Sequence, residues 1–136
     1  MIALFSIKPE YVDKIFSGEK DYEYRKVIFK GDVRKIVVYC TKPVGKIVGE
    51  FDVDEVLEGC PTKIWNQTKN NSGVCKVFYK DYFNGREKGY AIFIGEKVRY
   101  ENEIDPYDVF KSFSAPQSFR YLTEDDYQEC LTIASS

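Results

Sequence analysis

The chain has 136 residues, of which 43% are hydrophobic and 16% aromatic. This size and composition predict one folded domain over residues 1–136 and exclude a disordered chain. The net charge of −2 excludes a generally basic protein, and no apolar run approaches the length of a membrane span, so we expect no membrane partner and a cytoplasmic location.

The cysteines are widely spaced, and the chain contains no histidine; the four thiols are those of Cys40, Cys60, Cys75 and Cys130. A zinc site would need all four thiols from separate elements, so we expect reduced cysteines and no metal or other cofactor. Without histidine, neither a Ser-His-Asp triad nor a Cys-His pair can form. Any catalysis must therefore use Lys, carboxylate, Tyr, Ser or Thr side chains.

The first twenty-five residues predict a strand, a helix and a second strand in close succession. A strand is expected over residues 2–7, and Pro9 suits the first position of a helix that continues to residue 17. Gly18 is typical of a helix end. From residue 21 to about residue 29 the period changes to two, which places Glu23 and Arg25 on the opposite face of a strand from the neighbouring tyrosines.

Polar side chains stand at each junction of this segment. Lys8 and Lys20 flank the helix, and Glu23 and Arg25 follow on the next strand. If the two strands lie side by side, these four side chains converge into a cationic notch with one carboxylate, forming the wall of a functional cleft. The alternative is an ordinary solvated strand with a paired surface network.

The middle of the chain predicts two strands and two helices. The apolar run of residues 35–40 indicates a central strand, and residues 46–58 indicate a longer strand with a bulge at Gly49. The acids Glu50, Asp52 and Asp54 share one face of that strand, as in some divalent-cation sites. Helices are expected from Pro61 and over residues 75–83, the second with Phe78 facing inward.

The last third of the chain predicts further strands and a terminal helix. Residues 89–94 indicate an apolar strand, followed by a turn at Gly95 and a strand over residues 97–100. A short helical piece is expected after Pro106. Residues 115–122 alternate aromatic and polar side chains, as a strand does, and Thr123 is a candidate helix cap.

The order of elements favours an α+β fold, a small mixed β-barrel flanked by helices. No glycine-rich phosphate loop is present, which argues against nucleoside triphosphate hydrolysis. Charge is segregated: residues 1–46 carry +4, 47–60 carry −5, 61–100 carry +5 and 101–136 carry −6. This distribution permits a local basic face that binds a polyanion, unless the opposite blocks pair with each other across the fold.

Several short motifs occur in an order that resembles the ASCH domain of the PUA-like superfamily. They span nearly the whole chain and are the segments 6–9, 17–25, 48–50, 85–90 and 115–121. The resemblance implies a PUA-like β-barrel with helices beside a cleft, and a role in binding RNA. It also implies that Gly18, Lys20, Glu23 and Arg25 line that cleft.

One branch of this superfamily is similar to small amidohydrolases that act on N4-acetylcytidine with a lysine, a threonine and a glutamate. The lysine matches Lys20, but the threonine position is occupied by Glu23, and the glutamate position falls within residues 70–72, which contain no acid. Two of the three roles are therefore missing. Other relatives resemble ribonucleases.

Two hypotheses follow for the function. In the first, a monomeric binding module holds RNA or a nucleotide-like molecule: Lys8, Lys20 and Arg25 contact phosphates or a base edge, Glu23 orients Arg25, and a second wall is formed by Gln117, Ser118 and Arg120. Lys20→Ala or Arg25→Ala would then weaken RNA binding with little change in melting temperature.

In the second hypothesis the chain is a hydrolase acting on RNA or on a modified nucleoside. Lys20, its pKa lowered by neighbouring cations, is the base or nucleophile, Glu23 carries the proton, and Tyr24 or Ser118 is the donor.

Overall fold

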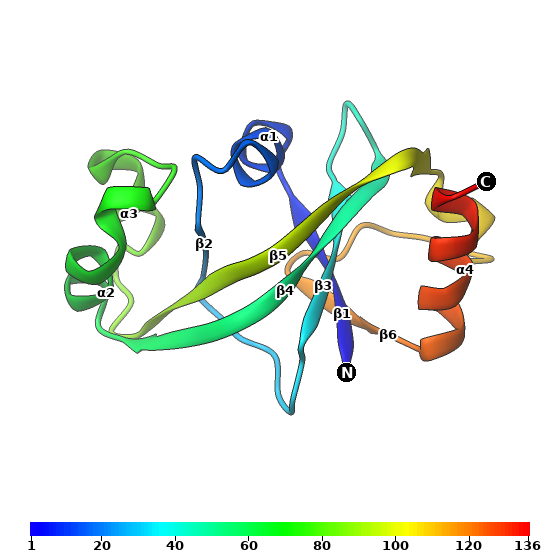
Figure 1. Ribbon diagram of the computed structural model, residues 1–136. Coiled ribbons are helices and arrows are strands. Elements are labelled where there is room, and N and C mark those ends of the chain that lie inside the picture. Colours follow the sequence, from blue (N-terminus) through cyan, green and yellow to red (C-terminus); the bar gives the residue numbers. More distant parts are fainter.

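The computed structural model describes residues 1–136, which fold around a single sheet of six strands (Figure 1). The strands are β1 (Ile2–Ile7), β2 (Tyr22–Arg25), β3 (Lys35–Cys40), β4 (Lys46–Gly59), β5 (Gly89–Ile104) and β6 (Phe119–Leu122). The helices are α1 (Pro9–Ser17), α2 (Pro61–Thr68), α3 (Lys76–Tyr82) and α4 (Glu124–Ala134), with the 3-10 turns η1 (Lys69–Asn71) and η2 (Pro106–Asp108). None of the helices has the length and apolarity that crossing a bilayer requires.

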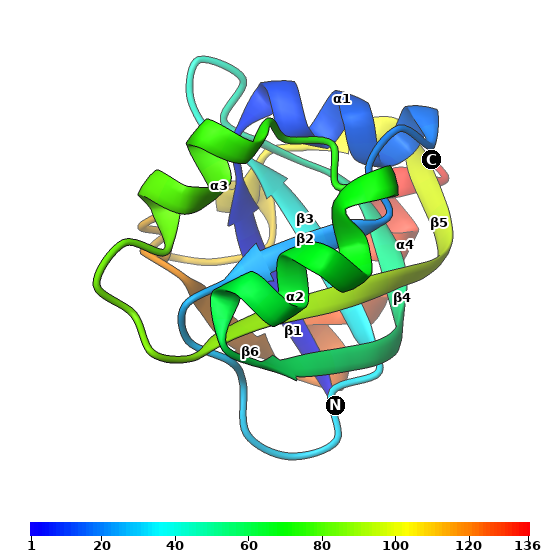
Figure 2. The ribbon, with the colours of Figure 1, turned by 90° about the vertical axis from the view of Figure 1, so that its left-hand side faces the viewer.

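The sheet is mixed, with the strand order β2-β5-β4-β3-β1-β6. β1 and β3 run parallel, and the other neighbouring strands are antiparallel. β4 and β5 are long strands (Figures 1 and 2). They bend because register shifts interrupt their pairing at several points. The bulge expected at Gly49 is confirmed, and a Cβ there would lie 2.5 Å from the Phe16 ring and 2.6 Å from the Val98 carbonyl oxygen.

The bent sheet brings its edge strands β2 and β6 near each other without pairing them. Arg25, the last residue of β2, donates one guanidinium hydrogen bond to the carbonyl oxygen of Ser118, just before β6, at 3.2 Å. It donates another to the carbonyl oxygen of Ser6 in β1 at 2.9 Å. The expected α+β fold, a barrel-like mixed sheet flanked by helices, is thus confirmed, with the barrel open between β2 and β6.

Three apolar clusters hold the helices on this sheet. The largest lies inside the curved sheet, where α1 contributes Val12 and Ile15 beside Phe5 and Phe51. A second cluster lies beneath α4, and a third beneath α2 and α3. The helices α2 and α3 therefore cover one side of the sheet and α4 covers the opposite side (Figure 1).

Two predicted strand limits are wrong. β2 ends at Arg25 rather than near Phe29, since residues 26–34 leave the sheet and Phe29 packs against Phe5 with ring centroids 6.2 Å apart. β5 continues through Gly95 without a turn. The nearest neighbour of a Cβ there would be the Asp54 carboxylate, which belongs to an exposed side chain that can move aside, so the residue marks a close approach between strands and not a chain reversal.

Two further expectations are corrected at α3 and β6. The buried side chain of α3 is Tyr79, whereas Phe78, expected inside, is 37% exposed. β6 includes only the second half of the expected segment 115–122. The Thr123 cap is confirmed, because its hydroxyl oxygen accepts the Asp126 amide at 3.0 Å.

Candidate functional site

A cavity of about 250 Å³ opens between α1, β2 and α3. Its floor is buried and polar, its walls are aromatic, and its exposed rim contains Lys8, Phe78 and Gln117. We call it the Lys20 pocket after the residue at its floor. The other lining residues are Ser6, Ile7, Tyr11, Glu23, Tyr24, Arg25, Val74, Tyr79 and Tyr82.

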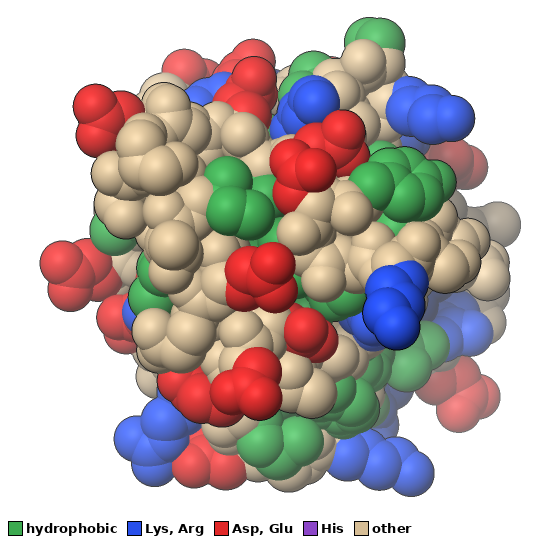
Figure 3. Space-filling view, turned by 90° about the vertical axis from the view of Figure 1, so that its right-hand side faces the viewer, with side chains coloured by type: hydrophobic (Ala, Val, Ile, Leu, Met, Phe, Trp, Pro, Cys, Tyr) green, Lys and Arg blue, Asp and Glu red, His purple; other side chains and the backbone are tan.

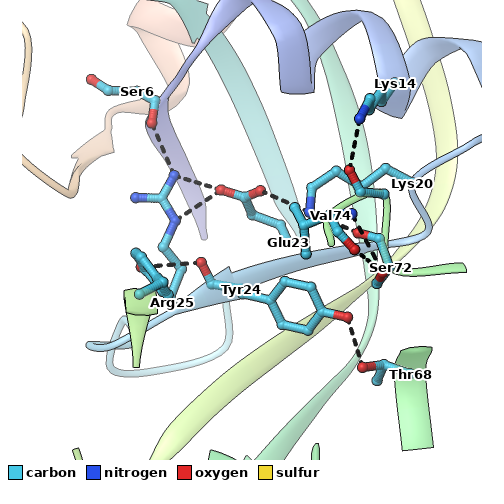
Figure 4. A network of polar contacts seen from close by, with 11 residues as sticks. Ser6, Lys14, Lys20, Glu23, Tyr24, Arg25, Thr68, Ser72 and Val74 are labelled. Carbon is cyan, nitrogen blue, oxygen red and sulfur yellow. Dashed lines mark hydrogen bonds and ion pairs between the residues drawn. The ribbon is translucent and has the colours of Figure 1, made fainter. Parts of the chain in front are cut away.

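Lys20 is only 2% exposed, although lysine is rarely buried to this degree. Its ammonium group donates to the Ser72 carbonyl oxygen at 3.1 Å and lies 4.8 Å from the centre of the Tyr24 ring (Figure 4). Burial lowers the pKa of Lys20 to about 8, against the opposing effect of Glu23. The sequence predicts neighbouring cations as the cause of the lowered pKa. Arg25 and Lys14 do lower it, but less than burial does. The amine is therefore partly neutral at physiological pH.

The segment between η1 and α3 holds Lys20 in place. Besides the Ser72 carbonyl, the Gly73 carbonyl oxygen accepts Lys14 Nζ at 3.1 Å, and the Asn71 carbonyl oxygen accepts the Asp21 amide at 2.9 Å. Gly73 has φ +70, and a Cβ there would lie 2.5 Å from Lys20 Cβ. Only glycine allows this segment to approach the lysine so closely.

Glu23 and Arg25 form a buried ion pair beside Lys20. Arg25 contacts Glu23 Oε2 through Nε at 3.0 Å and through Nη2 at 2.8 Å. The guanidinium also bonds the Ser6 carbonyl oxygen (Figure 4) and the Ser118 carbonyl oxygen, so it is almost fully used. Glu23 Oε1, in contrast, has only a 4.0 Å contact to Lys20 Nζ, so this oxygen remains free to accept a hydrogen bond from a ligand.

Aromatic rings form the walls above this floor. The centre of the Phe78 ring lies 5.6 Å from that of Tyr11 and 6.3 Å from that of Tyr82. The rings of Phe78 and Tyr82 are nearly parallel, with an interplanar angle of 13°. Burial raises the pKa of Tyr11 and Tyr82, and it raises that of Tyr24 to about 12. The phenols therefore stay protonated. Tyr82 already donates to the Tyr24 carbonyl oxygen and Tyr24 is hydrogen-bonded to Thr68, so the wall is a surface for stacking on which Tyr11 has the available donor.

The structure brings most of the predicted site residues together. Lys8, Lys20, Glu23, Arg25 and Gln117 all line the pocket. Ser118 contributes its carbonyl oxygen, which Arg25 uses, and its hydroxyl is not part of the lining.

Arg120 does not lie at the pocket, contrary to expectation. It is paired in register with Leu4, and its guanidinium lies 4.4 Å from the Phe110 ring. Leu4 and Phe110 belong to the cluster beneath α4, on the other face of the sheet. The prediction that Arg120 alternates with its aromatic neighbours along the strand is compatible with this position. The face of β6 that carries Arg120 is, however, the one turned toward α4 and away from the pocket.

The acids Glu50 and Asp52 form a separate cluster around Lys35. Glu50 is buried and accepts from Tyr100 at 2.7 Å, from Tyr127 at 3.0 Å and from Lys35 at 2.8 Å. Lys35 also pairs with Asp52 at 2.9 Å. Both Glu50 oxygens accept hydrogen bonds, and the bonds from Tyr127 connect α4 to the sheet. No group of three or more potential ligands in the chain is arranged to hold a metal ion.

Comparisons with known proteins identify one family and several relatives. The family model named ASCH domain matches residues 5–124. A Zymomonas mobilis protein named ASCH domain-containing ribonuclease is 26% identical over 136 residues, covering 98% of this chain and 92% of that protein. The crystal structure of ASCH from Zymomonas mobilis matches with a TM-score of 0.91 and 25% identity, over 97% of this chain and 94% of that one.

A further match has a different name. The large ribosomal subunit protein uL22 of Ureaplasma parvum is 30% identical over 122 residues, which cover 88% of this chain and 38% of that protein. The similarity to it therefore concerns only part of the longer protein.

Proposed function

Because the chain belongs to the ASCH domain family, we propose that it binds single-stranded RNA by holding one nucleotide in the Lys20 pocket. The observation that carries this proposal is the combination of a polar floor and aromatic walls in one cavity. Its volume of about 250 Å³ lies just below the range of roughly 300–1,000 Å³ typical of drug-sized ligands, as suits a single base with part of its sugar.

Each part of the pocket has a counterpart in a nucleotide. A base can stack on the wall of Phe78, Tyr11 and Tyr82, because single-stranded RNA is commonly bound through exposed bases on aromatic rings. At the floor, Lys20 donates to a base acceptor and Glu23 Oε1 accepts from a base N–H. Lys8 at the rim contacts a phosphate in this proposal. The four free cysteines fit the expected cytoplasmic location, and we propose that the domain acts as a monomer.

Phe78→Ala tests the stacking wall. Loss of one base–aromatic stack costs about 1–3 kcal/mol, so we expect RNA affinity to fall by roughly 5- to 150-fold. The measurement is fluorescence anisotropy with a labelled, unstructured 12-nucleotide RNA. Val77→Ala is the matched control, since Val77 lies on the same helix and is 79% exposed. Equal affinities of the two variants would contradict RNA binding in this pocket.

A second candidate function, cleavage of the bound strand, is favoured by the pKa of Lys20 near 8 and by the ribonuclease name of the Zymomonas relative. Neutral Lys20 would take the proton of a ribose 2′-hydroxyl. The 2′-oxygen would then form a bond to phosphorus while the bond from phosphorus to the 5′-oxygen breaks, leaving a 2′,3′-cyclic phosphate. The 5′-oxygen would receive a proton from a donor in the pocket.

The structure suggests Tyr11 as that donor in place of the residues expected from the sequence. The Tyr24 hydroxyl lies 2.7 Å from Thr68 Oγ1, whose own proton is donated to the Ile64 carbonyl oxygen, so the Tyr24 proton is directed away from the pocket. Tyr11 lines the pocket, and burial raises its pKa, which keeps it protonated.

Amidohydrolase activity is not proposed. The segment that would supply a glutamate lies beside Lys20 but offers it only the Ser72 carbonyl oxygen. Residue 23 is a glutamate where that chemistry uses a threonine hydroxyl, and residues 70–72 contain no carboxylate, so two of the three side chains implied by that resemblance are absent.

A further inference from the structure

Three cations around the Lys20 pocket have no acidic partner. Lys8 is an exposed residue of the rim. Lys26 Nζ lies 4.7 Å from the ring centre of Tyr82, a wall residue, and the Arg86 guanidinium donates to the Lys26 carbonyl oxygen at 3.2 Å. Every ion pair in the chain is made by other residues, so these three charges are available to an anionic ligand.

The three cations lie on two sides of the pocket. β1 and β2 run in opposite directions (Figure 1), and they meet where Arg25 donates to the Ser6 carbonyl oxygen. β1 ends just after this contact, and the chain continues to Lys8. β2 also ends at this contact, but its chain continues in the opposite direction, to Lys26. The loop after α3 that carries Arg86 runs beside the end of β2 (Figure 2). The pocket therefore has Lys8 on one side and Lys26 with Arg86 on the other.

The opposite side of the molecule is acidic. Figure 3 shows the α4 face, where carboxylates gather in the middle of the view. The first turn of α4 contains Glu124, Asp125 and Asp126, and residues 101–136 together carry a charge of −6. Some of the blocks of opposite charge do pair across the fold, as Lys46 does with Asp105 and Lys88 with Glu58. The three acids in the first turn of α4 have no such partner, so this face disfavours a polyanion.

We infer that the ligand is an internal nucleotide of a single strand, with the chain of phosphates crossing the mouth of the pocket. This inference rests on the proposed function. The base enters the pocket, the phosphate on one side contacts Lys8, and the phosphate on the other side contacts Lys26 and Arg86. A free nucleotide has phosphate on one side only and would leave one set of cations unused.

The test compares Lys26→Gln/Arg86→Gln with Lys63→Gln/Lys111→Gln, a pair of exposed lysines outside the pocket that removes the same charge. Each variant is titrated with an unstructured 12-nucleotide RNA and with the four nucleosides, which carry no phosphate, and its melting temperature is measured. For the first variant we expect about tenfold weaker RNA binding, a salt slope smaller by about 0.7 per lost phosphate contact, and unchanged affinity for the nucleosides.

The outcomes separate this inference from the proposed function. If Lys26→Gln/Arg86→Gln behaves like the control pair while Phe78→Ala still weakens RNA binding, the strand path is wrong and the pocket proposal survives. Equal losses for RNA and nucleosides would overturn the path as well, because they would indicate a change in the pocket itself. If the unmodified protein binds no RNA, both proposals fail together.

Discussion

Arg25→Ala is expected to lower the free energy of unfolding by about 3–5 kcal/mol, the usual cost of removing one partner of a buried ion pair. The substitution leaves Glu23 buried without its partner and removes the bonds from β2 to the Ser6 and Ser118 carbonyl oxygens. The sequence alone suggested that this change would leave the melting temperature nearly unaltered. The structure reverses that expectation, because Arg25 holds the open edge of the barrel.

Urea unfolding of Arg25→Ala and Arg34→Ala measures this difference. Arg34→Ala is the matched control. The ion pair from Arg34 Nε to Asp32 Oδ2 has a similar length, 2.9 Å, but the Arg34 side chain is 80% exposed. An exposed pair contributes about 0–1 kcal/mol, so Arg34→Ala should unfold at nearly the same urea concentration as the unmodified protein. Similar losses for both variants would show that Arg25 does not stabilise the barrel edge.

Lys20→Met is expected to reduce RNA cleavage, if the protein cleaves, by about 10²- to 10⁴-fold, the usual contribution of a general base. RNA affinity should fall much less, because the stacking wall and the rim cations remain. Since Lys20 must be neutral to accept a proton and its pKa is about 8, the cleavage rate of the unmodified protein should rise with pH and level off above about pH 8. The measurement is the rate at saturating RNA from pH 6 to 9.

Lys20→Arg and Lys14→Met complete this test. Arginine keeps the positive charge but does not lose its proton in this pH range, so Lys20→Arg should bind RNA without cleaving it. Lys14 bonds the Gly73 carbonyl oxygen, near the one that Lys20 uses, so Lys14→Met controls for loosening of that segment. Cleavage by Lys20→Arg at the unmodified rate would eliminate Lys20 as the base, and absence of cleavage by the unmodified protein would leave binding as the function.

Much of the fold and part of the site could be predicted from local patterns. Pro9 and Gly18 define α1, and the change of period after it defines β2, so Lys20, Glu23 and Arg25 were assigned to one cleft before any long-range contact was known. Adjacent residues in sequence determine these features.

The remaining parts of the site depend on contacts between distant segments. The Ser72 carbonyl oxygen reaches Lys20 across 52 positions, and no sequence pattern encodes that approach except the glycine that follows it. The aromatic wall was missed because Phe78 and Tyr82 have the same helical spacing as core residues. Arg120 was misplaced because alternation in a strand defines two faces without showing which one adjoins the pocket.

The central claim is that one nucleotide of an RNA strand occupies the Lys20 pocket. The most direct test is a crystal structure of the protein with a 2′-O-methyl trinucleotide, which cannot be cleaved through its 2′-oxygen. We expect the middle base beside Phe78 and Tyr82, within hydrogen-bond distance of Lys20 or Glu23, and its flanking phosphates near Lys8 and Lys26. A trinucleotide bound on another face, with no base in the pocket, would contradict this account.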